Sequence, residues 1–373
     1  MHSDQSDHTS SPHTADNPKH IQLLIAGGGL AGTLLAWNAG KRGLSFKIVD
    51  PVPSSNASLA AAGVLNPVTG KRLVKSWNVD TLLPAARATY REIEAICGGT
   101  YYHDREILRI IQTPDERHQW EKRITQPEYA SFLGELLPTG AAGHGWEDPL
   151  GSFRIHGVGN LEIPPMLDTL RNRFESSGSW IRDVLKYEDI RIHPDGIQWR
   201  NITADFVVFC EGHAGKQNPW FGHLPFNPAK GEVIEVGGIS IPSNPIVHKQ
   251  KWVLSVGENR IVTGSTWGWN PDNDQPTPQG RTAVFRGLCE MMPKAEGLPV
   301  VAHRAAIRPC TKDRQPFLGM HPLHKRIGIF NGFGSKGVLL IPLLANHFLD
   351  HMIENKPLMP EVSVQRVWQP VSD

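Results

Sequence analysis

The chain has 373 residues, of which 39% are hydrophobic and 20% charged, with a formal net charge of +1. This composition is typical of a soluble globular protein with a large core and two domains. The small net charge argues against a strong field for nucleic acid or an acidic membrane, and no apolar run reaches the roughly 20 residues of a membrane span.

The first twenty residues are polar and include four histidines. They lack the hydrophobic core of a signal peptide, so we expect residues 1–19 to form a disordered tail. A metal site built from these histidines is the less favoured alternative, and no metal is predicted. The four cysteines (Cys97, Cys210, Cys289 and Cys310) are widely spaced without a C-x-x-C pair. This spacing favours reduced thiols in the cytoplasm over a disulfide framework.

Residues 21–50 predict a dinucleotide site. Residues 21–26 are an apolar run typical of a buried parallel strand. A G-x-G-x-x-G turn and a helix follow, and a second apolar strand ends at Asp50. The turn brings phosphates close to backbone N–H groups at a helix N-terminus, and the acid can accept the ribose hydroxyls. The predicted cofactor residues of this unit are Gly27, Gly28, Gly29, Leu30, Ala31, Gly32 and Asp50.

These residues leave several cofactor alternatives open. Asp50 disfavours NADP, whose 2′-phosphate prefers an arginine there, but it does not separate NAD from FAD. The alternative without a cofactor is a glycine-rich loop in an ordinary α/β sheet. Residues 51–67 then form a loop of small side chains that let the backbone approach a flat molecule.

Several helices and strands are expected in the first half of the chain. Helices are predicted over residues 82–96, capped by Asp80 and ended by Gly98, then from Thr113, and over 166–175. Residues 180–184 predict a strand and 190–202 a hairpin. Residues 204–212 predict another buried parallel strand, which ends at Glu211 and Gly212, where the chain could meet the cofactor.

The second half changes character at residue 227. Residues 231–236, 246–256 and 260–264 alternate as antiparallel strands. Thr277 should cap a helix over 279–292, and residues 300–307 should return to the first domain. The chain then has a strand at 326–330, a second glycine-rich turn and a final helix over 338–354.

The predicted fold class is α/β, with a Rossmann-like dinucleotide domain and an inserted, mainly antiparallel substrate domain. We assign residues 20–80, 150–220 and 305–356 to the discontinuous cofactor domain. Residues 81–149 and 221–304 form the substrate domain.

Three stretches resemble the D-amino-acid oxidase superfamily, in its glycine oxidase and sarcosine oxidase branch. They are residues 58–65, 308–319 and 331–342. The Gly-Ser-Lys-Gly turn at 334–337 is also similar to the oxidase half of the enzyme that makes methylaminomethyl-uridine in tRNA. The resemblance implies FAD rather than NAD, with the flavin ring against the antiparallel domain. Ala306 stands where the sarcosine branch has its flavin-linking cysteine, so non-covalent FAD is expected.

The resemblance also implies positions around the cofactor. Val184 would meet the adenine through its backbone, residues 58–63 would line the flavin, and residues 334–339 would face its pyrimidine edge. The residues concerned are Ser58, Ala61, Ala62, Gly63, Val184, Gly334, Ser335, Lys336, Gly337, Val338 and Leu339.

Three residues are candidates for catalysis. Arg308 would hold a substrate carboxylate through two parallel hydrogen bonds, the alternative being a structural ion pair with Asp313. Lys336 would stabilise charge on the flavin or lie beside the substrate, unless it is an ordinary surface lysine. Trp252 would form a wall of the pocket, as would Trp267 and Trp269, with core packing as the alternative.

We therefore expect an FAD-dependent oxidase or dehydrogenase. It would oxidise the C–N bond of a small amine or amino acid by hydride transfer to the flavin, and water would hydrolyse the imine. Oxygen or an unknown partner would accept the electrons. The alternatives are an amine oxidase acting on tRNA, or a flavin-binding protein without turnover.

Overall fold

The computed structural model describes residues 19–53, 56–143 and 145–369. The predicted tail therefore lies outside the described residues, apart from Lys19, which starts the first strand. In the described residues, no cluster of three His, Cys, Asp or Glu side chains could hold a metal ion. None of the helices found there is long and apolar enough to cross a bilayer.

The buried apolar runs form a mainly parallel first sheet. Its spatial order is β10-β11-β12-β1-β2-β9, and β20 pairs with β12 and β19. Strand β1 lies between β12 and β2, parallel to both, which is the expected centre of a Rossmann-like fold. The strands are β1 (Lys19–Ala26), β2 (Phe46–Val49), β9 (Trp180–Ile181), β10 (Ile190–His193), β11 (Gly196–Trp199), β12 (Ile202–Phe209), β19 (Phe317–Met320) and β20 (Ile327–Asn331).

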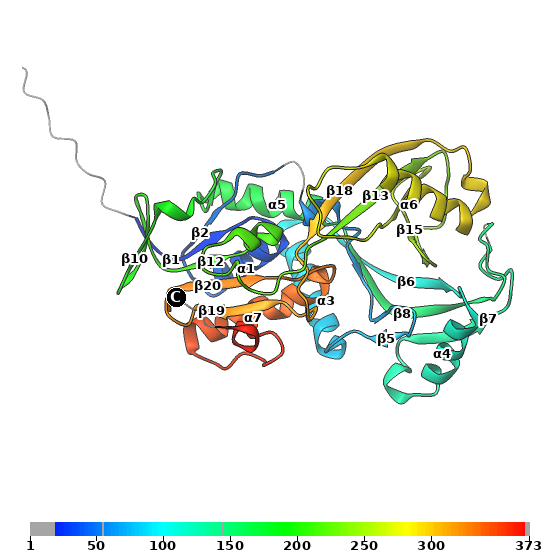
Figure 1. Ribbon diagram of the computed structural model, residues 1–373, viewed down its shortest axis with the longest axis horizontal. Coiled ribbons are helices and arrows are strands. Elements are labelled where there is room, and N and C mark those ends of the chain that lie inside the picture. The colour runs from blue at the N-terminus through cyan, green and yellow to red at the C-terminus, as the bar shows by residue number, and fades with distance from the viewer. Residues whose placement is uncertain (1–18, 54–55, 144, 370–373) are drawn as a thin grey trace, which may run out of the picture.

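Helices cover one face of this sheet (Figure 1). Helices α1 (Leu30–Lys41), α3 (Val79–Cys97), α5 (Ile163–Ser176) and α7 (Gly337–Glu354) bury their apolar sides in one cluster with β1 and β2. Helix α7 is the most apolar of them, and Leu344, Phe348 and Leu349 are completely buried. This packing fixes the N-termini of α1 and α7, the two helices that start at glycine-rich turns.

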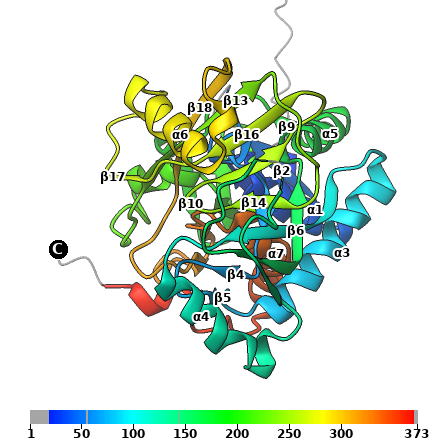
Figure 2. The same cartoon turned by 90° about the vertical axis from the view of Figure 1, so that its right-hand side faces the viewer.

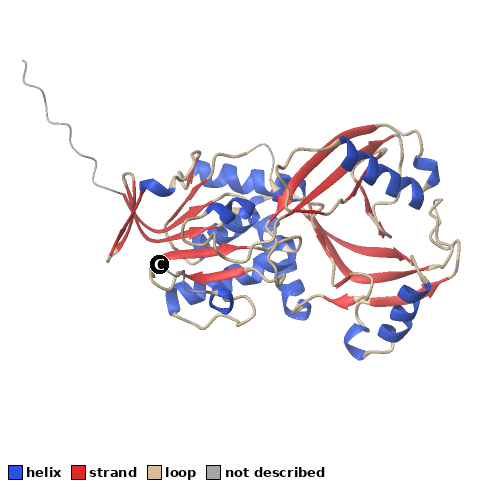
Figure 3. Cartoon of the chain, viewed as in Figure 1, coloured by secondary structure: helices blue, strands red, loops and turns tan. Residues whose placement is uncertain are grey.

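The second sheet is larger and mainly antiparallel (Figure 3). Its order is β17-β13-β16-β15-β14-β6-β8-β3, with β18 paired to β13 and β7 to β8. Its strands are β3 (Val64–Leu65), β6 (Tyr102–Ile110), β7 (Leu133–Leu137), β8 (Ser152–Leu161), β13 (Ala229–Gly237), β14 (Ile246–His248), β15 (Trp252–Ser255), β16 (Arg260–Gly264), β17 (Gly268–Trp269) and β18 (Val300–Arg308). Helices α4 (Pro114–Ile124) and α6 (Pro278–Met291) lie at this sheet, whereas the short strands β4 (Val68–Thr69) and β5 (Val74–Lys75) pair separately.

The α/β fold class is confirmed, and several local expectations are corrected. Asn78 precedes α3 as its cap residue, so Asp80 lies in the first turn instead of capping the helix. Residues 246–256 form the hairpin β14–β15 rather than one strand. The expected strand over 180–184 ends at Ile181. Residues 300–307, which were expected to return towards the first domain, lie in strand β18, and this strand pairs with β13 along its whole length.

The two sheets meet at chain segments that are far apart in sequence. Strand β3 pairs with β8 directly after the loop that follows α2 (Ala57–Ala60). Strand β18 runs from the second sheet towards the first and ends at Arg308 (Figure 1). The stretch 152–161 belongs to the second sheet because β8 pairs with β6. The predicted domain limits stay a prediction.

Candidate functional site

The glycine turn after β1 is packed too tightly for side chains. A Cβ atom on Gly32 would lie 1.9 Å from the Gly27 carbonyl oxygen, and one on Gly28 would lie 2.1 Å from the Trp180 ring. Helix α1 begins at Leu30, four residues after β1 ends at Ala26, and its free N–H groups favour an anion there. Trp180 was missed as a member of this site, because a contact between β9 and the turn has no local sequence signal.

Asp50 and Ser58 both lie at this turn. Asp50 accepts the N–H of Gly28 at 2.7 Å through Oδ2 and that of Val52 at 2.7 Å through Oδ1. Each carboxylate oxygen retains a lone pair for a ribose hydroxyl. Ser58 Oγ accepts the N–H of Leu30 at 3.0 Å, which places the serine at the N-terminus of α1.

The small-residue loop is tied to the second sheet. Gly63 has φ of +70°, and a Cβ atom there would lie 1.8 Å from the Leu161 carbonyl oxygen. The Leu161 N–H bonds the Gly63 carbonyl at 2.8 Å, and the buried Asn160 donates to the Ala62 carbonyl at 2.7 Å. The backbone of residues 61–63 is therefore fixed where the sheets meet. Sequence reasoning also missed Asn160.

Glu211 lies beside the glycine turn, at the end of β12. A Cβ atom on Gly27 would lie 3.4 Å from the Glu211 nitrogen. The carboxylate accepts hydrogen bonds from Tyr187 Oη at 2.7 Å and Asn218 Nδ2 at 2.9 Å. Burial raises the pKa of Glu211 to about 7, although both hydrogen bonds oppose this shift. The neighbouring Gly212 is held by a bond from Asn331 Nδ2 to its carbonyl at 2.9 Å.

Val184 stands apart from these residues. It follows the end of β9 at Ile181, and its side chain is 53% exposed. Its N–H bonds Asp183 Oδ1 at 2.7 Å. A contact between its backbone and an adenine therefore stays a prediction.

Arg308 is the last residue of β18, and its guanidinium lies flat on β13. A Cβ atom on Gly231 would lie 2.0 Å from Arg308 Nη2, so the missing side chain creates the space for the cation. Nη2 donates to Ser265 Oγ at 2.7 Å, and both terminal nitrogens lie 3.5 Å from the Thr266 carbonyl. The guanidinium carbon lies 4.5 Å from the Trp267 ring centre.

The predicted alternative partner of Arg308 is occupied elsewhere. Asp313 pairs with Arg366, at 2.9 Å from its Nε. Among the described residues, no acidic side chain lies within salt-bridge distance of Arg308. Burial lowers the pKa of this guanidinium. Within the described residues, Arg308 is thus a half-buried cation without a counter-ion. Such a group has a strong requirement for an anion.

The second glycine-rich turn is joined to the Arg308 loop. The Gly334 N–H bonds the Pro309 carbonyl at 3.1 Å, and a Cβ atom on Gly334 would lie 3.4 Å from Cys310 Sγ. Helix α7 starts two residues after Ser335, and Lys336 is its N-cap residue. Burial lowers the pKa of Lys336, and the positive charge of Arg314 lowers it further. In the described chain, no carboxylate pairs with Lys336. Lys336 therefore lies close enough to Arg314 for the two positive charges to interact, and neither forms an ion pair within the described residues.

Trp252 has a more ordinary environment. It faces Gly264 across β15 and β16, and its half-buried ring packs against the large apolar cluster. These contacts agree with core packing, so a role in the pocket stays a prediction.

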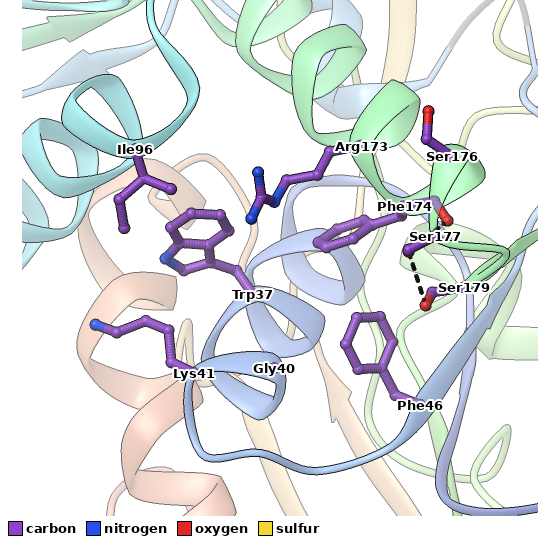
Figure 4. Close-up of a pocket in the computed structure, with 10 residues that line it drawn as sticks. All are labelled: Trp37, Gly40, Lys41, Phe46, Ile96, Arg173, Phe174, Ser176, Ser177 and Ser179. Atoms are coloured by element: carbon purple, nitrogen blue, oxygen red, sulfur yellow. Dashed lines mark hydrogen bonds between the residues drawn. The ribbon is translucent and has the colours of Figure 1, made fainter.

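A separate hollow of about 800 Å³ lies at the far end of α1. Figure 4 shows Trp37, Arg173 and Phe174 around it, from α1 and α5. A helix of 12 residues is about 18 Å long, so this hollow is remote from the glycine turn at the other end of α1. It contains none of the predicted site residues.

Comparison with known proteins gives one family match. The model described as FAD dependent oxidoreductase matches residues 22–350. Among curated proteins, glycine oxidase of Bacillus licheniformis is 24% identical over 358 residues, covering 90% of this chain and 94% of that protein.

A second relative is the tRNA 5-methylaminomethyl-2-thiouridine biosynthesis bifunctional protein of Marinobacter nauticus. It is 24% identical over 388 residues, which cover 97% of this chain but 59% of the relative. Among solved structures, glycine oxidase of Geobacillus kaustophilus has a TM-score of 0.81 at 21% identity, covering 95% of this chain and 100% of that one. Iminodiacetate oxidase of Chelativorans has a TM-score of 0.76 at 22% identity, covering 93% and 98%.

Proposed function

We propose, because the chain belongs to the FAD dependent oxidoreductase family, that it oxidises the C–N bond of an amine that carries a carboxylate. Membership confirms FAD as the cofactor, in place of NAD. Glycine oxidases and an iminodiacetate oxidase among the relatives support an amino-acid-like substrate. The guanidinium of Arg308, which has no acidic partner among the described residues, is the observation that carries the proposal.

The residues at the first sheet fit FAD. The protein packs so closely around Gly27, Gly28 and Gly32 that no side chain fits there, which would leave the backbone of the turn open to a pyrophosphate, and Asp50 has oxygens for the ribose. Residues 58–63 and 334–339 would lie along the flavin, held by β8 and α7. These cofactor-binding roles and the division of the chain into two domains are part of the proposal. When bound, FAD would accept a hydride from the carbon that bears the amine, and water would hydrolyse the resulting imine.

The chain's own residues would bind and orient the substrate. Arg308 would pair with the carboxylate in a half-buried site, where a charge-assisted pair of hydrogen bonds is strong. Its 3.5 Å contacts with Thr266 are long, so Nη1 is available to a carboxylate oxygen. The arginine is also one residue from Pro309, which bonds the turn before α7. This would place the anchored amine near the cofactor.

The start of α7 would supply positive potential at the cofactor. Its first N–H groups and the cationic Lys336 lie together at one helix end. Preorganised charge of this kind stabilises negative charge that develops during a reaction. Lys336 next to the substrate carboxylate is the alternative position.

An anaerobic absorbance scan of the purified holoenzyme tests the proposal. The panel contains glycine, sarcosine, proline and D- and L-amino acids, and each is paired with the same amine without its carboxylate. We expect bleaching of the flavin band by members of the first set and none by their counterparts. Bleaching by simple amines alone would contradict the carboxylate requirement.

A tRNA-linked amine is the second candidate. The similarity to the bifunctional tRNA-modifying protein favours it, although the chain spans 59% of that relative. Unfractionated tRNA belongs in the same scan. Bleaching by tRNA, with no response to any free amino acid, would replace the first candidate by the second.

A further inference from the structure

Trp267 and Trp269 form an exposed aromatic pair. Their side chains are 48% and 50% exposed, and the ring centres lie 5.4 Å apart at an angle of 71°. Large apolar side chains that remain exposed together mark binding sites in many proteins. An edge-to-face pair of indoles offers a broad surface for another flat ring.

The pair lies next to the proposed carboxylate anchor. The Trp267 ring covers the Arg308 guanidinium, and Trp269 and Arg308 both pair with Ala229 of β13. Strand β17, which carries Trp269, is the outer strand of the second sheet and lies at the periphery in Figure 2. A molecule held by Arg308 would therefore have one end at the anchor and could extend along the indoles towards solvent.

The segment that carries the indoles is held in place. The buried Glu232 carboxylate accepts the N–H and the hydroxyl of Thr277, both at 2.8 Å. At the other end, the Glu232 N–H bonds Thr266 Oγ1 at 2.9 Å, and the Thr266 N–H bonds the Glu232 carbonyl at 3.2 Å. Glu232 thus fixes both ends of the loop 266–277, so the indoles form a preorganised surface.

We propose that Trp267 and Trp269 are a stacking platform for a flat aromatic group on the substrate. The inference rests on the proposed function and narrows it to an aromatic, carboxylate-bearing amine. Trp267 already uses its ring in the contact with Arg308. Among the residues that the structure describes, no cation lies over the Trp269 ring, so its exposed face is the specificity-determining surface. An amine as small as glycine, held at Arg308, would leave this surface uncovered.

Carboxylates that cannot be oxidised test the platform without turnover. Binding of acetate, cyclohexylacetate and phenylacetate to the holoenzyme is measured from the change in the flavin spectrum. We expect phenylacetate to bind about five- to tenfold more tightly than cyclohexylacetate, because stacking favours a flat ring. Trp269→Ala should abolish this preference for phenylacetate over cyclohexylacetate, and Trp269→Phe should retain it. Ile353→Ala, an exposed apolar residue on α7, is the matched control.

The outcomes separate the two proposals. Equal affinities for the two ring compounds, with Arg308-dependent acetate binding, would overturn the platform and leave the proposed function intact. A preference that survives in Trp269→Ala would also overturn it. If that variant changes only the self-association of the chain, the indoles are an interface. If no carboxylate binds and no amine reduces the flavin, both proposals fail.

Discussion

Because residue 231 is a glycine, the guanidinium of Arg308 can lie against strand β13. In Gly231→Ala the new methyl group would stand 2.0 Å from Nη2, so the guanidinium must leave the surface of β13. We expect KM for the reducing amine to rise about tenfold or more, with the fold intact, since a displaced anchor weakens the charge pair. Gly40→Ala is the control, because Gly40 lies at the end of α1 far from the glycine turn, and a Cβ atom there would meet only the Phe46 ring, at 3.3 Å. Equal KM values in both variants would contradict this account of Arg308.

The raised pKa of the buried Glu211 carboxyl predicts that the free energy of unfolding depends on pH. Burial raises the pKa of its carboxyl from 4.5 to about 7, so the folded protein binds the proton more tightly than the unfolded chain does. Its stabilising contribution is therefore complete below about pH 4.5 and is lost as the pH rises to 7.

Urea unfolding of the apoprotein at pH 5, 6 and 7 measures this effect. We expect Glu211→Gln to flatten the decline in unfolding free energy by up to about 3 kcal/mol. Glu188→Gln, which removes an exposed acid next to Tyr187, is the control and should follow the wild type. A parallel decline in all three proteins would show that Glu211 ionises normally.

At the scale of elements, helix α7 contains Pro342 in its second turn. Proline has no N–H, so the Val338 carbonyl four residues earlier loses its usual helical partner. Tyr90 of α3 replaces that partner, because its hydroxyl donates to the Val338 carbonyl at 2.7 Å in a buried position. Helix α3 thus completes the hydrogen bonding of the helix whose N-terminus faces the proposed flavin site.

A double-mutant cycle tests this replacement. Tyr90→Phe should lower the free energy of unfolding by about 1–3 kcal/mol, since it leaves a buried carbonyl without a donor. In a Pro342→Ala background the loss should be smaller, because alanine restores the helical N–H. Chemical denaturation of the four proteins gives the coupling energy. Additive effects would mean that the hydroxyl does not serve the proline-freed carbonyl.

A second element-scale feature is the buried ion pair between β6 and α4. Arg109 donates to Glu116 Oε1 at 2.7 Å through Nε, and both side chains are almost completely buried. His248 of β14 also contacts Arg109. Burial, together with the positive charge of Arg109, holds the pKa of the His248 imidazole well below its usual value. Glu116→Gln should therefore lower the unfolding free energy by about 3–5 kcal/mol. A loss below about 1 kcal/mol would show that water reaches the pair.

At the scale of the whole molecule, local patterns predicted the first sheet better than the second. The unit from Ile21 to Asp50 and the apolar helix α7 follow from runs and periodicities within one segment. Strand β6 carries Asp104, Arg105 and Glu106, so it shows no apolar run. Its charges are satisfied across strands, for example by bonds from Arg154 and His156 of β8 to Glu106 at 2.6 and 2.7 Å. Such a strand is recognised only when its partner is known.

The candidate site likewise contains some features that local sequence patterns predict and others that depend on long-range packing. The glycine turn, Asp50 and the turn before α7 could be read from the sequence because their spacing has a physical cause. The partner of Asp313 could not, since Arg366 lies 53 residues further along the chain. Trp180 at Gly28 and Asn160 at Ala62 are also long-range contacts. Tertiary packing therefore decided which charged groups were left free for a ligand, and Arg308 is the one that matters most.

The measurement that tests the account most directly is an anaerobic titration of the flavin with the best reducing amino acid. It compares the wild type with Arg308→Ala and with Arg304→Ala, which removes an exposed arginine from the same strand. We predict that Arg308→Ala raises the dissociation constant about 30-fold or more, the cost of removing one partner of a desolvated charge pair. Arg304→Ala should match the wild type. An unchanged dissociation constant in Arg308→Ala would contradict the central claim that this guanidinium binds the substrate carboxylate.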